Sequence, residues 1–206
     1  MTLLNYDSLQ AMYKKYFKSL IDWLIALFAL LVLFPLFLMV AIAIKFDTNG
    51  PVLFVQERLG RNKRAFKIYK FRSMTHNNKG ISNNKLYEND PRITKVGHIL
   101  RKTSIDELPQ IINILKGEMS FIGPRPPIPQ FPKKPEEYNE FERKRFLVKP
   151  GISGLAQVRC REIHDWDINI PIDVEYVLNY SFSYDLKLFF TSLSFFFRSD
   201  NIYRKE

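Results

Sequence analysis

Residues 23–44 read WLIALFALLVLFPLFLMVAIAI, a run of 22 residues without a charged side chain. As one straight helix this run would measure roughly 33 Å at about 1.5 Å per residue, enough to cross a hydrocarbon core of about 30 Å. It is too long for the apolar core of a typical signal peptide, and no small-residue cleavage site follows it. The sequence therefore predicts a segment that is retained and embedded in a membrane.

Both flanks of this segment are basic, which bears on its topology. Lys14, Lys15 and Lys18 precede it, and Lys45 and Arg58 are the first cations after it. Positively charged flanks are preferentially kept in the cytoplasm. The charge pattern therefore favours a segment whose two ends both lie on the cytoplasmic side of the membrane.

Pro35 interrupts the apolar run. A proline inside a helix lacks the N–H group and collides with the preceding turn. A break there would leave legs of about 12 and 9 residues, roughly 18 and 14 Å long, each too short to cross alone. We therefore expect residues 1–46 to form a re-entrant helix-break-helix that enters and leaves one leaflet. An ordinary transmembrane helix with a kink at the proline is the alternative.

The remaining residues, 47–206, are enough for one cytosolic domain. The whole chain carries 31 Lys and Arg against 21 Asp and Glu, a net charge of +10. An anionic bilayer, a phosphorylated substrate or nucleic acid could each account for this excess. The single cysteine, Cys160, excludes an intrachain disulfide. Three scattered histidines show no zinc-ligand spacing, so we expect no structural metal.

The pattern beyond the anchor predicts a helix-rich α+β domain. Residues 51–72 alternate apolar and basic side chains around a turn at 60–62, as the two strands of a β-hairpin do. In the second strand apolar side chains are interleaved with Lys67 and Lys70, which predicts one packed face and one cationic face.

Two further segments have a clear composition. Residues 76–95 are polar and rich in Asn, which predicts a loop that could serve as a lid. Residues 180–203 carry Phe and Leu at helical spacing, which predicts an amphipathic helix. Such a helix packs on the domain core or lies in the plane of the lipid headgroups, and we favour the interfacial position.

The chemistry is concentrated in residues 101–126, RKTSIDELPQIINILKGEMSFIGPRP. Apolar residues from Leu108 to Leu115 have helical spacing and stop at Gly117. Asp106 and Glu107 then stand at the N-terminus of the helix, where carboxylates or phosphates are favoured. A capping box, with Ser104 as the N-cap and Glu107 reaching back, is the competing structural interpretation.

Cations surround these two carboxylates in the sequence. Arg101 and Lys102 precede them, and Arg125 follows in Gly-Pro-Arg-Pro, where two prolines fix the backbone around one guanidinium. Such neighbours should keep both carboxylates ionised. An ionised carboxylate can coordinate Mg²⁺ or attack phosphorus, and the arginine suits phosphate recognition.

At this point the chain resembles the small monotopic phosphoglycosyl transferases, the bacterial sugar transferases that initiate glycoconjugate assembly. The resemblance extends from about Tyr16 to Phe197. It rests on four ordered motifs, KIYKFRSM (67–74), RKTSIDELPQ (101–110), LKGEMSFIGPRP (115–126) and KPGISGLAQV (149–158).

The resemblance implies an activity and a set of site residues. Asp106 would be the nucleophile of an Asp-Glu dyad with Glu107, and would form a covalent phosphosugar intermediate with the help of Mg²⁺. UMP would leave a UDP-sugar, and undecaprenyl phosphate would accept the phosphosugar at the inner leaflet of the bacterial membrane. By position, five residues match family residues near the dyad or the substrate: Lys70, Arg101, Arg125, Arg161 and Asp185.

One position departs from the family pattern. Relatives often have Ser before the proline of the membrane helix, whereas Phe34 precedes Pro35 here. No adjacent hydroxyl can then satisfy the carbonyls that the proline frees.

Two other functions fit parts of the sequence. A glycosyltransferase that moves the sugar alone would release UDP, and a non-enzymatic adaptor would bind acidic lipids or nucleic acid through its basic face. We expect an enzyme without a nucleic-acid partner. The residues do not indicate which sugar is used or the oligomeric state.

Overall fold

The computed structural model of the chain describes residues 6–75, 90–160 and 165–196. Within these residues, helices dominate and the strands form two small two-stranded sheets. The predicted helix-rich α+β class is confirmed. Most of the predicted loop 76–95, Arg161 and the end of the predicted C-terminal helix lie outside the described residues, so their roles stay predictions.

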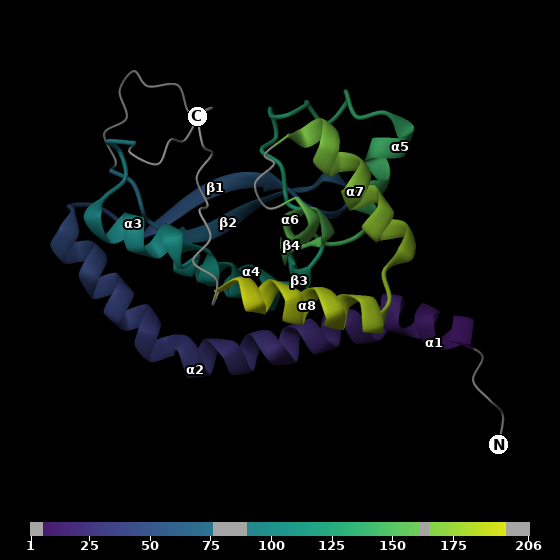
Figure 1. Ribbon diagram of the computed structural model, residues 1–206, viewed down its shortest axis with the longest axis horizontal. Coiled ribbons are helices and arrows are strands. Elements are labelled where there is room, and N and C mark those ends of the chain that lie inside the picture. Colours follow the sequence, from purple (N-terminus) through teal and green to yellow (C-terminus); the bar gives the residue numbers. More distant parts are fainter. Residues whose placement is uncertain (1–5, 76–89, 161–164, 197–206) are drawn as a thin grey trace.

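The chain is helical from Tyr6, the first described residue, to Asp47. This part consists of α1 (Tyr6–Met12), a π-helical stretch (Tyr13–Phe17) and α2 (Lys18–Asp47). The predicted break at Pro35 is wrong as a break, because Pro35 lies inside one continuous helix of 30 residues. A proline removes a single N–H donor, which bends a helix without ending it when the flanking turns stay bonded. Figure 1 shows that α2 curves around the domain, running below α8 and then rising toward α3.

The predicted β-hairpin is confirmed. Strands β1 (Leu53–Leu59) and β2 (Ala65–Phe71) pair antiparallel, with Leu53 opposite Phe71 and Leu59 opposite Ala65. The predicted division into a packed and a cationic face is wrong. Lys70 lies two residues from the buried Ile68 and therefore on the same face of the strand, because side chains alternate between faces.

The middle of the chain contains the short elements that hold the site. They are α3 (Lys95–Lys102), the 3₁₀ helix η3 (Ile105–Gln110), α4 (Ile111–Leu115) and β3 (Ser120–Ile122), and β3 pairs parallel with β4 (Gly151–Ser153). The predicted stop of the helix is confirmed: α4 ends at Leu115, and Gly117 follows with a positive φ of 76°, a conformation that glycine adopts without strain.

The rest of the described domain is helical. It comprises α5 (Glu140–Arg143), the 3₁₀ helix η4 (Lys144–Leu147), α6 (Leu155–Arg159), α7 (Trp166–Asn179) and α8 (Phe182–Phe196). A helix at the predicted C-terminal position is therefore present. Leu188 of α8 is buried in the core and Phe190 is 60% exposed, so one side of α8 packs on the domain and another is open.

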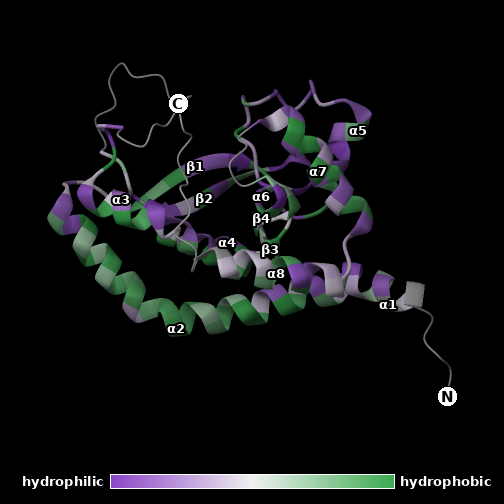
Figure 2. Cartoon of the chain, in the orientation of Figure 1, coloured by the Kyte–Doolittle hydropathy of each residue, from purple (hydrophilic) through white to green (hydrophobic). Residues whose placement is uncertain are grey.

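Only a narrow stripe of α2 packs on the domain. Ala26 of this stripe clusters with residues of β2 and α4, while Val40 and Ile44 cluster with residues of β2 and α3. Most other large apolar side chains of α2 are exposed, such as Phe28 at 70% and Leu31 at 68%. Figure 2 shows this apolar character along α2. Among the described residues, one helical stretch, Gln10–Asp47, is long and apolar enough to cross a membrane.

Candidate active site

Asp106 and Glu107 lie together in η3, and both side chains are partly exposed. The residue before η3, Ser104, has a left-handed backbone (φ 54°) and makes no side-chain cap. The capping box is therefore not formed. Glu107 instead accepts a hydrogen bond from Nζ of Lys70, at 2.5 Å from its Oε1, and Nη2 of Arg125 lies 3.8 Å from the same oxygen.

The two neighbouring carboxyl groups differ in pKa. Burial raises the pKa of Asp106 to about 6; Lys70 opposes this rise and the charge of Glu107 adds to it. Burial would also raise the pKa of Glu107, but Lys70 and Arg125 outweigh it and lower the pKa to about 2. With these values both groups are mainly ionised at pH 7, as expected, but Asp106 holds a proton more readily than Glu107 does. Asp106 keeps basicity, which a nucleophile needs.

Four cations act on this pair of carboxyl groups. Lys70 comes from β2, Arg101 from the last turn of α3 and Arg125 from the segment after β3. The charges of all three lower the pKa of Asp106. Three of the five predicted substrate-binding residues are thus gathered around Asp106 and Glu107.

The fourth cation, Arg58, was not among the site residues predicted from the sequence. It lies in β1 and its charge helps to lower the pKa of Glu107. Its own pKa is lowered to about 10 by burial and by Arg125. In the sequence Arg58 is one of many basic residues of the hairpin. In the structure its Nη1 donates a hydrogen bond to the carbonyl oxygen of Pro126 at 3.0 Å, which places Arg58 beside the loop that carries Arg125.

The loop that carries Arg125 is held at each of four consecutive carbonyl groups. Pro124 accepts from the Gly151 N–H at 3.0 Å and Pro127 from the Leu59 N–H at 2.9 Å. The two carbonyls between them accept from side chains: that of Arg125 from Arg145 at 2.8 Å, and that of Pro126 from Arg58 at 3.0 Å. These contacts confirm that the Pro-Arg-Pro segment presents its guanidinium from a fixed backbone.

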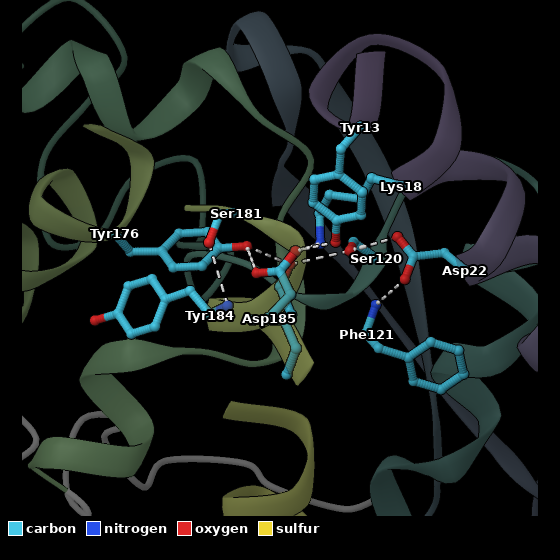
Figure 3. Close-up of polar contacts among 10 residues, drawn as sticks. Tyr13, Lys18, Asp22, Ser120, Phe121, Tyr176, Ser181, Tyr184 and Asp185 are labelled. Carbon is cyan, nitrogen blue, oxygen red and sulfur yellow. Dashed lines mark hydrogen bonds and ion pairs between the residues drawn. The ribbon is translucent and has the colours of Figure 1, made fainter. Parts of the chain in front are cut away.

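Asp185 lies in another cluster, which Figure 3 shows. Its carboxylate accepts hydrogen bonds from Tyr13 and Lys18 at 2.6 Å and from Tyr176 at 2.7 Å. Asp22 of α2 lies nearby and accepts from Ser120 at 2.6 Å. These contacts connect α2 and the turn before it with β3, α7 and α8. The assignment of Asp185 to the substrate stays a prediction.

A family model described as bacterial sugar transferase matches residues 13–199 of the chain. The chain belongs to the bacterial sugar transferase family. The UDP-N-acetylgalactosamine-undecaprenyl-phosphate N-acetylgalactosaminephosphotransferase of Aeromonas hydrophila is 40% identical over 181 residues, which cover 86% of this chain and 43% of that protein. The UDP-glucose:undecaprenyl-phosphate glucose-1-phosphate transferase of Escherichia coli (strain K12) is 36% identical over 197 residues, covering 91% and 42%.

This bacterial sugar transferase thus spans less than half the length of those two relatives. It spans most of another, the exopolysaccharide production protein PSS of Rhizobium leguminosarum bv. phaseoli, with 42% identity over 182 residues, 84% of this chain and 91% of that protein.

Two motifs of the sugar transferase meet where β3 pairs with β4. A Cβ atom on Gly123 would lie 2.5 Å from the carbonyl oxygen of Lys149, and one on Gly154 would lie 2.2 Å from that of Gly123. Such distances leave no room for a side chain. The glycines therefore allow the two backbones to touch, which places the Arg125 loop at the end of β3.

Proposed function

We propose that this chain transfers a sugar-1-phosphate from a UDP-sugar to undecaprenyl phosphate, giving polyprenyl-diphosphate-sugar and UMP, as the first membrane step of a glycan or polysaccharide pathway. The proposal rests on one observation: two adjacent, partly exposed carboxyl groups lie among four cations, of which Lys70, Arg125 and Arg58 lower the pKa of Glu107, while burial raises that of Asp106. The names of the Aeromonas and Escherichia relatives contain both substrates.

In the proposed reaction Asp106 is the nucleophile. One of its carboxylate oxygens bonds to the phosphorus that carries the sugar, and the bond from that phosphorus to the bridging oxygen breaks, so that UMP leaves. An oxygen of undecaprenyl phosphate then attacks the same phosphorus and releases the Asp106 carboxylate. Covalent catalysis of this kind divides one exchange into two phosphoryl transfers at one side chain.

The cations supply the electrostatics that phosphoryl transfer requires. Charge develops on the phosphoryl oxygens, and fixed positive groups stabilise it without reorganisation. Arg125 is suited to this role because its side chain is 45% exposed while its backbone is held. Glu107 keeps Lys70 directed at the site through their ion pair.

Mg²⁺ fits the residues around Asp106. Within the described part of the chain, no group of three or more His, Cys, Asp and Glu side chains gathers to enclose a metal. Mg²⁺ is usually held by only one or two carboxylates together with phosphates and water. Asp106 would be the protein ligand, since Lys70 engages Glu107. The ion would supply neutralisation of the phosphate charges.

The position of α2 supports a monotopic anchor in the inner leaflet, with the domain facing the cytoplasm. Near the start of the apolar run Asp22 accepts a hydrogen bond from Ser120, and after its end Asp47 accepts one from the Val96 N–H at 3.0 Å. Both ends of the run therefore contact the same polar domain. A perpendicular crossing would draw one of these contacts into hydrocarbon, where polar groups are costly.

The anchor also passes close to the candidate site. Ile105, the neighbour of Asp106, packs against the cluster that contains Val40 and Ile44 of α2. A lipid phosphate held at headgroup depth beside this part of α2 could reach Asp106. This arrangement explains why an enzyme that joins a soluble nucleotide to a lipid would carry such a helix.

The decisive experiment incubates the purified chain with undecaprenyl phosphate, Mg²⁺ and a panel of UDP-sugars and measures the nucleotide released. UMP is expected. Asp106→Asn should abolish turnover and the labelled covalent intermediate, while Asp167→Asn, at an exposed position in the first turn of α7, should change neither. Release of UDP would favour transfer of the sugar alone, and an unaffected Asp106→Asn variant would favour the adaptor.

The topology has its own test. A tag placed before Met1 and a tag placed after Glu206 should both be reached only from the cytoplasmic side of oriented vesicles. A Met1 tag that is reached only from the periplasmic side would refute the one-leaflet anchor and leave a transmembrane helix.

A further inference from the structure

Arg145 and Asp173 form an ion pair inside the domain. Arg145 lies in η4 and Asp173 in α7, both side chains are only 1% exposed, and Nη2 of Arg145 lies 2.6 Å from Oδ2 of Asp173. A buried pair of this kind adds little stability compared with well-packed apolar residues, because both charges lose their hydration. Its location next to the site therefore calls for an explanation other than stability.

The same nitrogen that binds Asp173 also holds the site. Nη2 of Arg145 donates a second hydrogen bond, at 2.8 Å, to the carbonyl oxygen of Arg125. Nη2 of Arg125 in turn lies 3.8 Å from Oε1 of Glu107. One buried nitrogen thus connects α7 to the backbone of a residue of the candidate site.

The guanidinium of Arg145 is fixed in orientation as well as in position. Its Cζ lies 5.3 Å from the ring centre of Phe146 and 5.2 Å from that of Trp166, both within the range of cation–π attraction. Asp173 then sets the direction in which Nη2 points. The donor to the Arg125 carbonyl is therefore held by two rings and one carboxylate.

We propose that Arg145, oriented by Asp173, is a positioning residue that sets where Arg125 stands relative to Asp106 and Glu107. The inference rests on the proposed phosphoryl transfer, because it assigns Arg125 to the phosphates of the substrate. The prolines on either side of Arg125 restrict its backbone, so a displaced carbonyl shifts the base of the side chain directly. A displacement of about 1 Å in such a group can lower the rate about a hundredfold.

The test replaces the ion pair as a unit. Arg145→Met combined with Asp173→Val removes both buried charges together, which is often neutral for stability, but leaves the Arg125 carbonyl without its donor. We expect a melting temperature close to that of the wild type and a fall in kcat of about tenfold or more. In an Arg125→Ala background the same two substitutions should change kcat less than about twofold, because the effect passes through Arg125.

A matched control is available on the same helix. Arg159 and Glu175 also form an ion pair between α7 and a neighbouring element, but it is exposed and does not contact the loop. Arg159→Met with Glu175→Val should leave kcat unchanged in both backgrounds.

Two results would overturn the inference: a folded Arg145→Met/Asp173→Val variant with wild-type kcat, or an equal loss of kcat with and without the Arg125 side chain. If this variant does not fold, kcat of Arg145→Lys, which keeps the charge pair, is measured with and without Arg125→Ala. An equal loss of kcat in the two backgrounds would again overturn the inference. Failure of the wild type to release UMP from every UDP-sugar would instead count against the proposed function, so the two failures are distinguishable.

Discussion

Lys18, the first residue of α2, forms an ion pair with Asp185 in the first turn of α8, with Nζ 2.6 Å from Oδ2. The two residues are 167 positions apart in the sequence, and their side chains are 11% and 8% exposed. Tyr13 and Tyr176 donate to the same carboxylate, as Figure 3 shows. Charge-assisted hydrogen bonds therefore fasten the apolar helix to the C-terminal helices.

The first prediction concerns this fastening. Asp185→Ala should lower the free energy of unfolding by about 3–5 kcal/mol, because it leaves the charge of Lys18 and two hydroxyl groups without their acceptor. Denaturant unfolding in detergent measures this, with Glu175→Ala, at an exposed ion pair, as the control. A raised KM for the UDP-sugar with unchanged stability would contradict this prediction and favour the substrate role assigned by resemblance.

The second prediction is that Asp106→Asn and Glu107→Gln shift stability in opposite directions at pH 7. Burial raises the pKa of Asp106 from 3.8 to about 6, so the folded state holds its proton more tightly than the unfolded state. Folding stability then falls as pH rises from about 4 to about 6, and the asparagine variant escapes this loss. We expect it to be more stable by on the order of 1–3 kcal/mol at pH 7 and equally stable near pH 4.

For Glu107 the sign is reversed. Lys70 and Arg125 overcome the effect of burial and lower its pKa from 4.5 to about 2, so its ionised form stabilises the fold above about pH 4.5. Glu107→Gln should therefore be less stable than the wild type at pH 7, and the difference should shrink as pH falls toward 2. Unfolding curves recorded in EDTA across this range check both variants. A loss of stability in Asp106→Asn at pH 7 would show that folding does not raise the pKa of Asp106.

The third prediction separates two lysines of one strand. Lys70→Met removes the ion pair with Glu107 and a charge that acts on Asp106, and it should lower kcat about 10²- to 10³-fold, as the loss of a preorganised donor does. Lys67→Met, at an exposed position of β2, should leave kcat within about twofold, since it removes no group of the site. Equal effects of the two substitutions on UMP release would mean that the rate depends on the positive charge of the whole surface and not on Lys70 in particular.

The fourth prediction concerns the exposed face of α2. Phe28→Glu with Leu31→Glu should reduce the fraction of protein that sediments with membranes, because each buried charge costs about 2.5–3.5 kcal/mol in a membrane helix. Both positions are at least 68% exposed, so the domain itself should keep its melting temperature in detergent. Phe141→Glu, on an exposed residue of α5, is the control. Unchanged sedimentation of the double variant would mean that this face does not contact lipid.

Several features of the site could be predicted from the sequence because each depends on neighbouring residues. The stop of α4 follows from Gly117, the hairpin from its alternation, and the rigid presentation of Arg125 from the prolines on either side. The predicted capping box is wrong because it also considered neighbouring residues alone and assumed that Glu107 would bond within its own turn. Lys70, 37 positions away, binds that carboxylate as a charged donor, and Ser104 has a left-handed backbone and makes no side-chain cap.

By itself the sequence determined that the chain carries a long apolar segment, a hairpin and an Asp-Glu pair flanked by cations. Only the tertiary structure decided that α2 bends without breaking and lies along the domain, that Arg58 faces the dyad, and that Arg145 reaches the Arg125 carbonyl. The physical reason is range. Hydrophobic periodicity, turns and caps act over a few residues, whereas burial, pKa values and the partners of buried charges depend on which distant segments the folded chain brings within a few ångströms.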